Sequence, residues 1–206
     1  MILLRDPDAA LVMACKNPEG EGFEAAFEAI FLKYRDRVYS IAYRVTGSSM
    51  DAMDVVQESF SIIFRKLETF RAGSLFSTWL FRIVVNASID QRRREQKKFG
   101  PHFQFEDAAE PMLNSALNPE AIAATKELGS QVQEAMQKLS PKLRVILALR
   151  YLEDMSYDSL AVTLSLSMGT VKSRLARAHI ALEKVLRAQY PHLHDQDSEQ
   201  RAEGAS

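Results

Sequence analysis

The chain has 206 residues, of which 47% are hydrophobic and 26% are charged, and its formal net charge is −1. This composition is typical of a soluble globular protein and suffices for one ordinary domain or two small ones. Because the net charge is close to zero, any binding to nucleic acid must depend on local clusters of Lys and Arg. Cys15 is the single cysteine, so no intrachain disulfide can form, which fits a reducing cytoplasm.

The sequence contains no clear membrane or export signal. Residues 1–14 lack the basic, apolar and cleavage regions of a signal peptide. The most apolar stretch, residues 75–87, carries Arg82 in its middle and is too short to cross a bilayer. We therefore expect a cytoplasmic protein without direct membrane contact.

The hydrophobic pattern predicts an all-α fold, because apolar residues recur at three- and four-residue steps and no alternating strand is evident. In the first half, an apolar stripe from Phe23 to Val45 indicates a long helix that Gly47 ends. A second helix is expected over about 51–67. A third begins near Ser77 and continues through a run of arginines at its end.

The second half follows a change in composition. From about 98 to 125 there is no sustained stripe and prolines interrupt the chain, which predicts a flexible linker. Helices then resume, with Ser140 before Pro141 as one start and Ser156 as the cap of another. The polar tail over 189–206 is expected to be disordered. We expect two small helical domains, over 22–97 and 126–188.

The strongest local signal covers residues 156–177. A short helix, a turn at 165–167 and a longer basic helix form the layout of a helix-turn-helix, whose second helix fits the major groove of DNA. The alternative is a solvated basic helix in an ordinary bundle. The residues expected to face DNA, or to let the backbone approach it, are Thr170, Lys172, Ser173, Arg174, Ala176 and Arg177.

A polar, mostly acidic stripe lies on the expected second helix. Asp51, Asp54 and Glu58 fall at steps of three and four residues, with Gln57 beside them. Such a stripe suits a partner surface rich in arginine. Taken alone, it is better explained as an ordinary solvated helix face.

The third expected helix carries groups that can hydrogen-bond bases. Thr78, Arg82, Asn86 and Asp90 recur every four residues. The arginines that follow suit phosphates, and the loop before the helix provides a pocket for an unstacked base. The alternative is a core helix whose basic end is favoured by the helix dipole. The arginines are Arg92, Arg93 and Arg94, and the loop residues are Phe70, Gly73, Ser74 and Leu75.

Taken together, these segments resemble the extracytoplasmic-function (ECF) group of sigma factors. The segments over 51–60 (DAMDVVQESF) and 76–90 (FSTWLFRIVVNASID) resemble the sigma-2 signature. The segments over 139–150 and 156–175 are similar to the sigma-4 domain. The resemblance covers about 22–97 and 126–188, with no further domain between them, as in the ECF group.

The resemblance implies a sigma factor that binds core RNA polymerase, recognises the −10 and −35 promoter elements and assists melting. Asp51, Asp54, Gln57 and Glu58 would face the clamp helices of the largest polymerase subunit. The −10 element would be contacted by the loop, Arg82, Asn86, Asp90 and the arginines over 92–94. The −35 element would be contacted by the helix that begins near Thr170. Core polymerase and promoter DNA are thus the expected partners, together with an anti-sigma factor, which in this family is often membrane-anchored.

Two residues depart from the family pattern. Ser165 stands at a turn position where the family often has glycine, and a left-handed backbone is mildly unfavourable for serine. Ser159 replaces the usual acidic residue three positions after the Ser156 cap. We expect both to change the details of the turn and to leave the fold intact.

Two other classes of function remain as alternatives. A stand-alone helix-turn-helix regulator would dimerise on two half-sites, yet no apolar stripe is left over for a dimer. For an enzyme, neither the four histidines nor the carboxylates have a ligand or nucleophile–base spacing. We therefore expect no enzymatic activity, no cofactor and no metal.

Overall fold

The computed structural model describes residues 6–17, 20, 22–71, 73–99 and 119–191, and it describes only the backbone of residues 99 and 119–126. Within these ranges the chain is helical and contains no strand. The helices are α1 (Ala9–Ala14), α2 (Phe23–Thr46), α3 (Ser49–Lys66), the short 3-10 helix η1 (Leu67–Thr69), α4 (Phe76–Phe99), α5 (Pro119–Gln137), α6 (Pro141–Tyr151), α7 (Tyr157–Leu164) and α8 (Met168–Gln189). The all-α prediction agrees with this arrangement.

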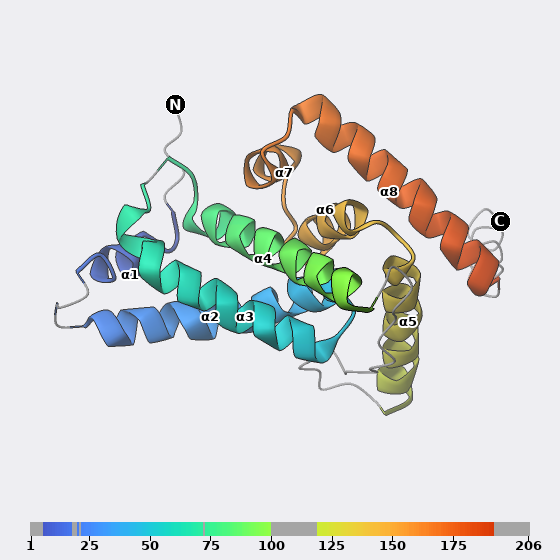
Figure 1. Cartoon of the computed structure of the whole chain (residues 1–206), viewed down its shortest axis with the longest axis horizontal. Helices are drawn as coiled ribbons and strands as arrows, with labels where there is room; N and C mark the ends of the chain where they lie inside the picture. The colour runs from blue at the N-terminus through green and yellow to red at the C-terminus, as the bar shows by residue number, and fades with distance from the viewer. Residues whose placement is uncertain (1–5, 18–19, 21, 72, 100–118, 192–206) are drawn as a thin grey trace, which may run out of the picture.

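The first half is built on α2, α3 and α4, which lie side by side (Figure 1). Their apolar stripes meet in one interior, where Ile30, Val38, Ile63 and Leu80 are fully buried. Ser48 begins α3, because its Oγ accepts a 3.2 Å hydrogen bond from the Asp51 N–H. This is the core that the three- and four-residue spacing predicts.

Gly47 ends α2 as expected, and it has a second role. Its φ of 84° is left-handed, which glycine adopts without strain. A Cβ at this position would also lie 2.5 Å from the side chain of Gln137 on α5. The end of α2 is therefore a point of close approach between the two halves of the chain.

The second half consists of α5 to α8, with α7 and α8 at the upper side of Figure 1. Val145, Leu160, Leu175 and Ala178 form its interior. This interior is continuous with that of the first half, because α6 packs on α2 and α7 packs on α4. Most of the expected linker, 98–125, and most of the expected tail, 189–206, lie outside the described residues, although α4 extends to Phe99 and α5 begins at Pro119.

Candidate nucleic-acid interface

The helix-turn-helix is formed by α7, a three-residue turn and α8. The Ser156 Oγ accepts from the Ser159 N–H at 3.1 Å, and the Ser167 Oγ accepts from the Thr170 N–H at 3.2 Å, so each helix begins at a serine cap. Ser165 has a φ of 53°, so the backbone is left-handed at the turn position where the family often has glycine. The turn forms with serine in place of glycine.

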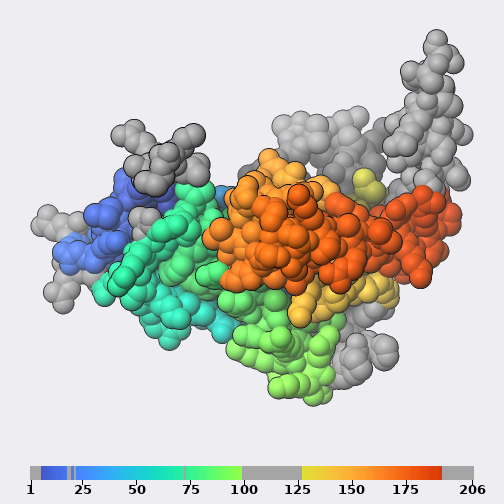
Figure 2. All heavy atoms as spheres, turned by 90° about the horizontal axis from the view of Figure 1, so that it is seen from above, coloured from blue at the N-terminus to red at the C-terminus, as the bar shows by residue number. Residues whose placement is uncertain are grey.

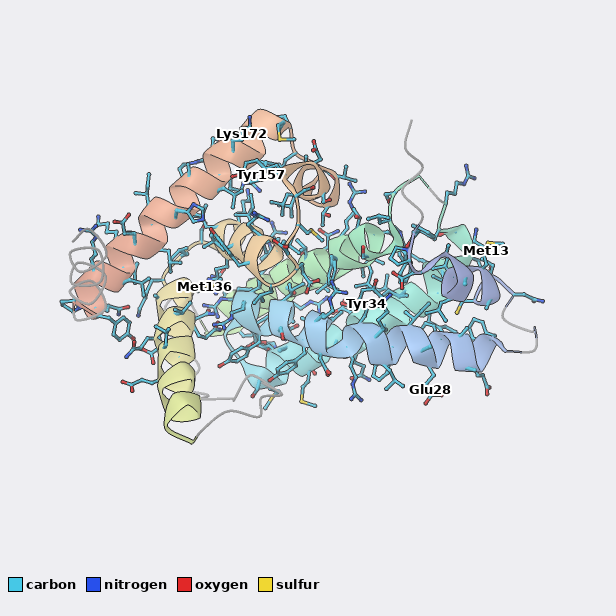
Figure 3. The ribbon with its side chains drawn as sticks, turned by 180° about the vertical axis from the view of Figure 1, so that it is seen from behind. Met13, Glu28, Tyr34, Met136, Tyr157 and Lys172 are labelled. Atoms are coloured by element: carbon cyan, nitrogen blue, oxygen red, sulfur yellow. The ribbon has the colours of Figure 1, made fainter. Side chains whose placement is uncertain are left out.

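The two sides of α8 differ in burial and charge. Val171, Leu175 and Ala178 are buried against the rest of the second half. The other side is exposed, and Figure 3 shows Lys172 near the amino end of this helix. Of the residues expected to face the −35 element, Lys172, Ser173, Ala176 and Arg177 are exposed, and Thr170 and Arg174 are half-buried. In Figure 2 the orange and red atoms of α7 and α8 form much of one face, beside the green atoms of α4.

The loop before α4 is held at its ends and open in its middle. Phe70 is buried, with its ring centroid 5.7 Å from that of Phe76 and 5.3 Å from that of Trp79. Gly73 is exposed, and no atom lies within 4 Å of the place where a Cβ would be. Ser74 and Leu75 are half-buried. Phe70 therefore supports the loop from inside, whereas Thr69, Arg71 and Gly73 are exposed.

On α4, the expected DNA-facing residues do not all share one environment. Asn86, Asp90 and Arg93 are exposed, and Arg93 pairs with Asp90 at 3.3 Å. Arg92 is only 7% exposed, and its Nε is buried without a hydrogen-bond partner among the described residues. The expectation that Arg92 faces phosphates is not met in this arrangement, because the turn of α4 directs it inward.

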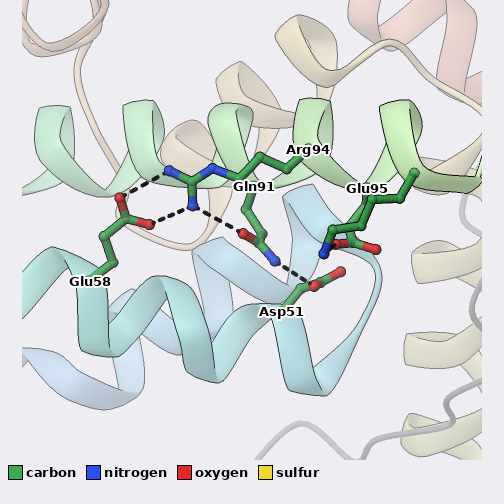
Figure 4. A network of polar contacts seen from close by, with 6 residues as sticks. Asp51, Glu58, Gln91, Arg94 and Glu95 are labelled. Atoms are coloured by element: carbon green, nitrogen blue, oxygen red, sulfur yellow. Dashed lines mark hydrogen bonds and ion pairs between the residues drawn. The ribbon is translucent and has the colours of Figure 1, made fainter.

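The side chain of Arg94 is exposed and reaches across to α3 (Figure 4). Its guanidinium donates to both oxygens of Glu58, at 3.2 and 3.4 Å, and to the Gln91 Oε1 at 3.5 Å. The hydrogen bonds with Glu58 and its charge raise the pKa of Arg94. Arg94, which was expected to contact DNA, is thus paired with Glu58, which was expected to contact polymerase.

Asp51 is the second member of the acidic stripe that departs from expectation. It is 5% exposed, and the Gln91 Nε2 donates to its Oδ1 at 2.8 Å (Figure 4). Burial raises the pKa of the Asp51 carboxyl, and its hydrogen bond with Gln91 opposes that change. Asp51 therefore connects α3 to α4. Asp54 and Gln57 are exposed, and Glu58 is half-buried.

Residues from both expected DNA-binding surfaces line a single crevice of about 290 Å³ between α4 and the helix-turn-helix. Arg82 and Asn86 come from α4, Lys142 from α6 and Arg174 from α8. Arg82 spans from α4 to the helix-turn-helix at this crevice by donating to the Val162 carbonyl at 2.9 Å and to the Ser165 Oγ. The surfaces expected to contact separate promoter elements are therefore adjacent in this structure.

Buried polar contacts that the sequence did not reveal join the two halves at the end of α2. Arg144 on α6 is 3% exposed, and its guanidinium donates to the carbonyls of Val45 at 2.7 Å, Leu139 at 3.0 Å and Gln137 at 2.5 Å. Burial, followed by the charge of Arg92, lowers the pKa of Arg144 to about 9. The sequence offered one signal for this contact, because Arg144 stands next to the apolar residues 145–149.

Further contacts complete this junction. The Gln133 Nε2 donates to the Tyr43 carbonyl at 2.9 Å, and the Gln137 Nε2 donates to the Arg44 carbonyl at 3.2 Å. The Tyr43 carbonyl also accepts from the Gly47 N–H at 2.9 Å, so Gln133 adds a second bond there. The last carbonyls of a helix lack the usual partner within it, and Gln137 supplies a donor for that of Arg44. Nearer the middle of α2, Arg37 pairs with the buried carboxylate of Glu153.

Comparison with known proteins decides the family. The sigma-70 region 2 profile matches residues 30–98, and the sigma-70 region 4 profile matches residues 130–182. The ECF RNA polymerase sigma factor SigW of Bacillus subtilis is 31% identical over 174 residues, which are 81% of this chain and 92% of SigW. The chain belongs to the ECF group of sigma-70 factors.

Other relatives of this sigma factor agree. The ECF RNA polymerase sigma-E factor of Salmonella typhimurium is 34% identical over 168 residues, which are 79% of this chain and 87% of that protein. The structure of CnrH in complex with the cytosolic domain of CnrY matches with a TM-score of 0.63 at 23% identity, covering 88% of this chain and 98% of the matched chain. The sigma factor RpoE from Bartonella quintana, in complex with the anti-sigma factor NepR, matches with a TM-score of 0.62 at 23% identity, covering 79% and 98%.

These matches confirm the resemblance drawn from the sequence, and with it the function of directing transcription initiation. They extend over both halves of the chain, so a stand-alone helix-turn-helix regulator is not favoured. Among the described residues, no helix combines the length and apolar character needed to span a bilayer.

Proposed function

We propose that this sigma factor divides promoter recognition between its two halves while core RNA polymerase holds them apart. The outer side of α8, with Lys172, Ser173 and Arg177, would contact the −35 element. The loop over 69–75, with Asn86 and Arg82 on α4, would bind unstacked bases of the −10 element. Asp54, Gln57 and Glu58 on α3 would contact polymerase.

The crevice between α4 and the helix-turn-helix carries this proposal. Arg82, Asn86 and Arg174 line it together. The two elements are separated by about 25 base pairs, which at about 3.4 Å per base pair is about 85 Å of duplex. The closed arrangement cannot contact both elements at once, so the halves have to separate before both are bound. The segments 22–97 and 126–188 would act as two units joined by the linker over 98–125.

Free protein should therefore bind promoter DNA poorly. Two weak sites give tight binding only when their spacing is fixed, which is the task assigned to core polymerase. An electrophoretic mobility shift with the purified chain, alone and with core polymerase, tests this on a promoter found by mapping transcription starts in vitro. Specific, tight binding without core polymerase would contradict the proposal.

The same arrangement suggests how activity is restrained. RpoE from Bartonella quintana was solved with the anti-sigma factor NepR, and CnrH with the cytosolic domain of CnrY. We propose that an anti-sigma factor stabilises the closed form of this chain in the cytoplasm and covers its polymerase-binding side. The chain itself would perform no catalysis, since polymerase supplies the chemistry. An anti-sigma protein that co-purifies with the chain and blocks transcription in vitro would support this.

A further inference from the structure

The residues before α2 reach across the fold to the place where the candidate −10 loop meets α4. Asp6 accepts a 2.7 Å hydrogen bond from the Phe76 N–H through its Oδ2, although the two residues are 70 positions apart. Phe76 is the first residue of α4. The residue before it, Leu75, has no side-chain acceptor, so the start of this helix lacks the usual local cap. Asp6 supplies the missing acceptor from a distant part of the chain.

Asp6 is itself held in place by α1 and α2. Its Oδ1 accepts from the Asp8 N–H at 3.0 Å. Asp8 is fully buried, and its carboxylate accepts from the Lys33 Nζ and from the Tyr34 hydroxyl, both at 2.5 Å. Val12 and Cys15 continue this attachment by packing into the core. The acceptor at Asp6 is thus positioned by contacts that do not involve the loop.

The loop is consequently held at both ends by different means. Near its start, Phe70 packs against Phe76 and Trp79. At its last, the backbone turns into α4 where Asp6 accepts from Phe76. The intervening Gly73 is exposed, and its N–H donates to the Arg71 carbonyl at 2.7 Å. A pocket for an unstacked base needs such a frame, because binding weakens when the loop must first be ordered.

We infer that Asp6 is a positioning residue for −10 recognition: it fixes the junction between the loop and α4 and so holds the loop in the conformation that binds bases. This inference rests on the proposed role of the loop. It assigns to the segment over 6–15 a part in promoter melting that neither family profile covers, since the first matched residue is 30.

The sole tryptophan gives a direct readout of the free chain. Trp79 lies against Phe70 and Phe76 in the frame of the loop. We expect Asp6→Ala to increase the quenching of Trp79 fluorescence by acrylamide about twofold. Asp6→Asn should give an intermediate value, because an amide has one acceptor oxygen for the two N–H groups that Asp6 bonds. Asp36→Ala, which removes an exposed carboxylate paired with its neighbour Arg35, is the matched control.

The second readout uses core polymerase and a promoter on which the unaltered chain forms open complexes. Asp6→Ala should lower open-complex formation about fivefold, the order expected for loss of one helix cap. It should also reduce discrimination at the −10 bases while leaving sensitivity to −35 substitutions unchanged. Asp6→Asn should again be intermediate, and Asp36→Ala should match the unaltered chain.

The outcomes separate this inference from the proposed function. If the unaltered chain forms no open complexes with core polymerase, the proposed function fails, and the fluorescence series still tests the frame. If Asp6→Ala leaves both Trp79 quenching and −10 discrimination unchanged, the inference is wrong. A uniform loss of transcription with unchanged −10 discrimination would also overturn it, because that result indicates only a structural role.

Discussion

The guanidinium of Arg82 on α4 donates a 2.9 Å hydrogen bond to the backbone carbonyl of Val162 in the last turn of α7. Its Nε also donates to the Thr163 carbonyl at 3.3 Å. The Val162 carbonyl also accepts from the Ser165 N–H at 3.3 Å, so Arg82 adds contacts to the end of α7 from the opposite half of the chain. The side chain proposed to contact the −10 element is therefore occupied in the closed form.

Replacing Arg82 should have opposite effects on two steps. Arg82→Ala removes these hydrogen bonds and should destabilise the closed form by about 1 kcal/mol, which raises the open fraction about fivefold. The apparent affinity for core polymerase should rise by up to the same factor, while −10 binding weakens. Titration of labelled core polymerase measures the first effect. Arg93→Ala, which removes a pair made within α4, is the control, and weaker polymerase binding by the Arg82 variant would contradict the prediction.

Arg144 should be among the residues most important for stability. Arg144→Met leaves three buried carbonyls without their donor, and we expect a loss of about 3 kcal/mol in the free energy of unfolding. Arg144→Lys should lose less, because one ammonium can satisfy some of the carbonyls. Urea unfolding measures both. Arg187→Ala, which removes an exposed pair with Glu183 on α8, should change stability by no more than about 0.5 kcal/mol.

The buried carboxyl of Asp51 should make stability depend on pH. Its pKa is raised in the folded chain, so the folded state binds a proton more readily than the unfolded state. The penalty for burying the charge is fully present above the raised pKa, and it disappears as the pH falls towards the ordinary value of 3.8.

Asp51→Asn should therefore be at least as stable as the unaltered chain at pH 7, and the difference should shrink as the pH is lowered. Urea unfolding at a series of pH values checks this. A stability difference that grows with falling pH would contradict the prediction.

The exposed basic side of α8 should govern −35 recognition. Arg177→Ala and Lys172→Ala should each weaken promoter binding by the polymerase complex about tenfold, with a reduction of about one in the slope of log affinity against log salt for a lost phosphate contact. A residue that contacts a base edge should instead lose discrimination at one −35 position. Arg187→Ala, near the far end of α8, serves as the control and should leave both quantities unchanged.

Helices were predictable from the sequence because their signals are local. The stripe of α2, its end at Gly47 and the serine caps of α7 and α8 each depend on residues within a few positions of one another. The family resemblance added the function, because four motifs stand in one order. The inward position of Arg92 was missed, although four-residue steps from the buried Leu80 and Val84 lead to it on the same face of the helix.

Contacts over long distances in the chain were beyond that kind of inference. Asp6 bonds Phe76, Arg82 bonds Val162 and Arg144 bonds Val45, and in each pair a side chain meets a backbone group. Every residue has a backbone carbonyl, and every residue except proline has a backbone N–H. The type of the partner residue therefore does not indicate such a contact. Only the fold shows which carbonyl or N–H a distant side chain meets.

Because Gly47 has no side chain, a mutation at this position would affect the contact between the two halves of the chain. A larger residue there would strain the left-handed backbone and collide with Gln137, yet position 47 belongs to neither proposed DNA-binding surface. Asparagine tolerates such a backbone but would still meet Gln137. A substitution of Gly47 would thus alter the packing of the two halves while leaving the residues proposed to contact each promoter element unchanged.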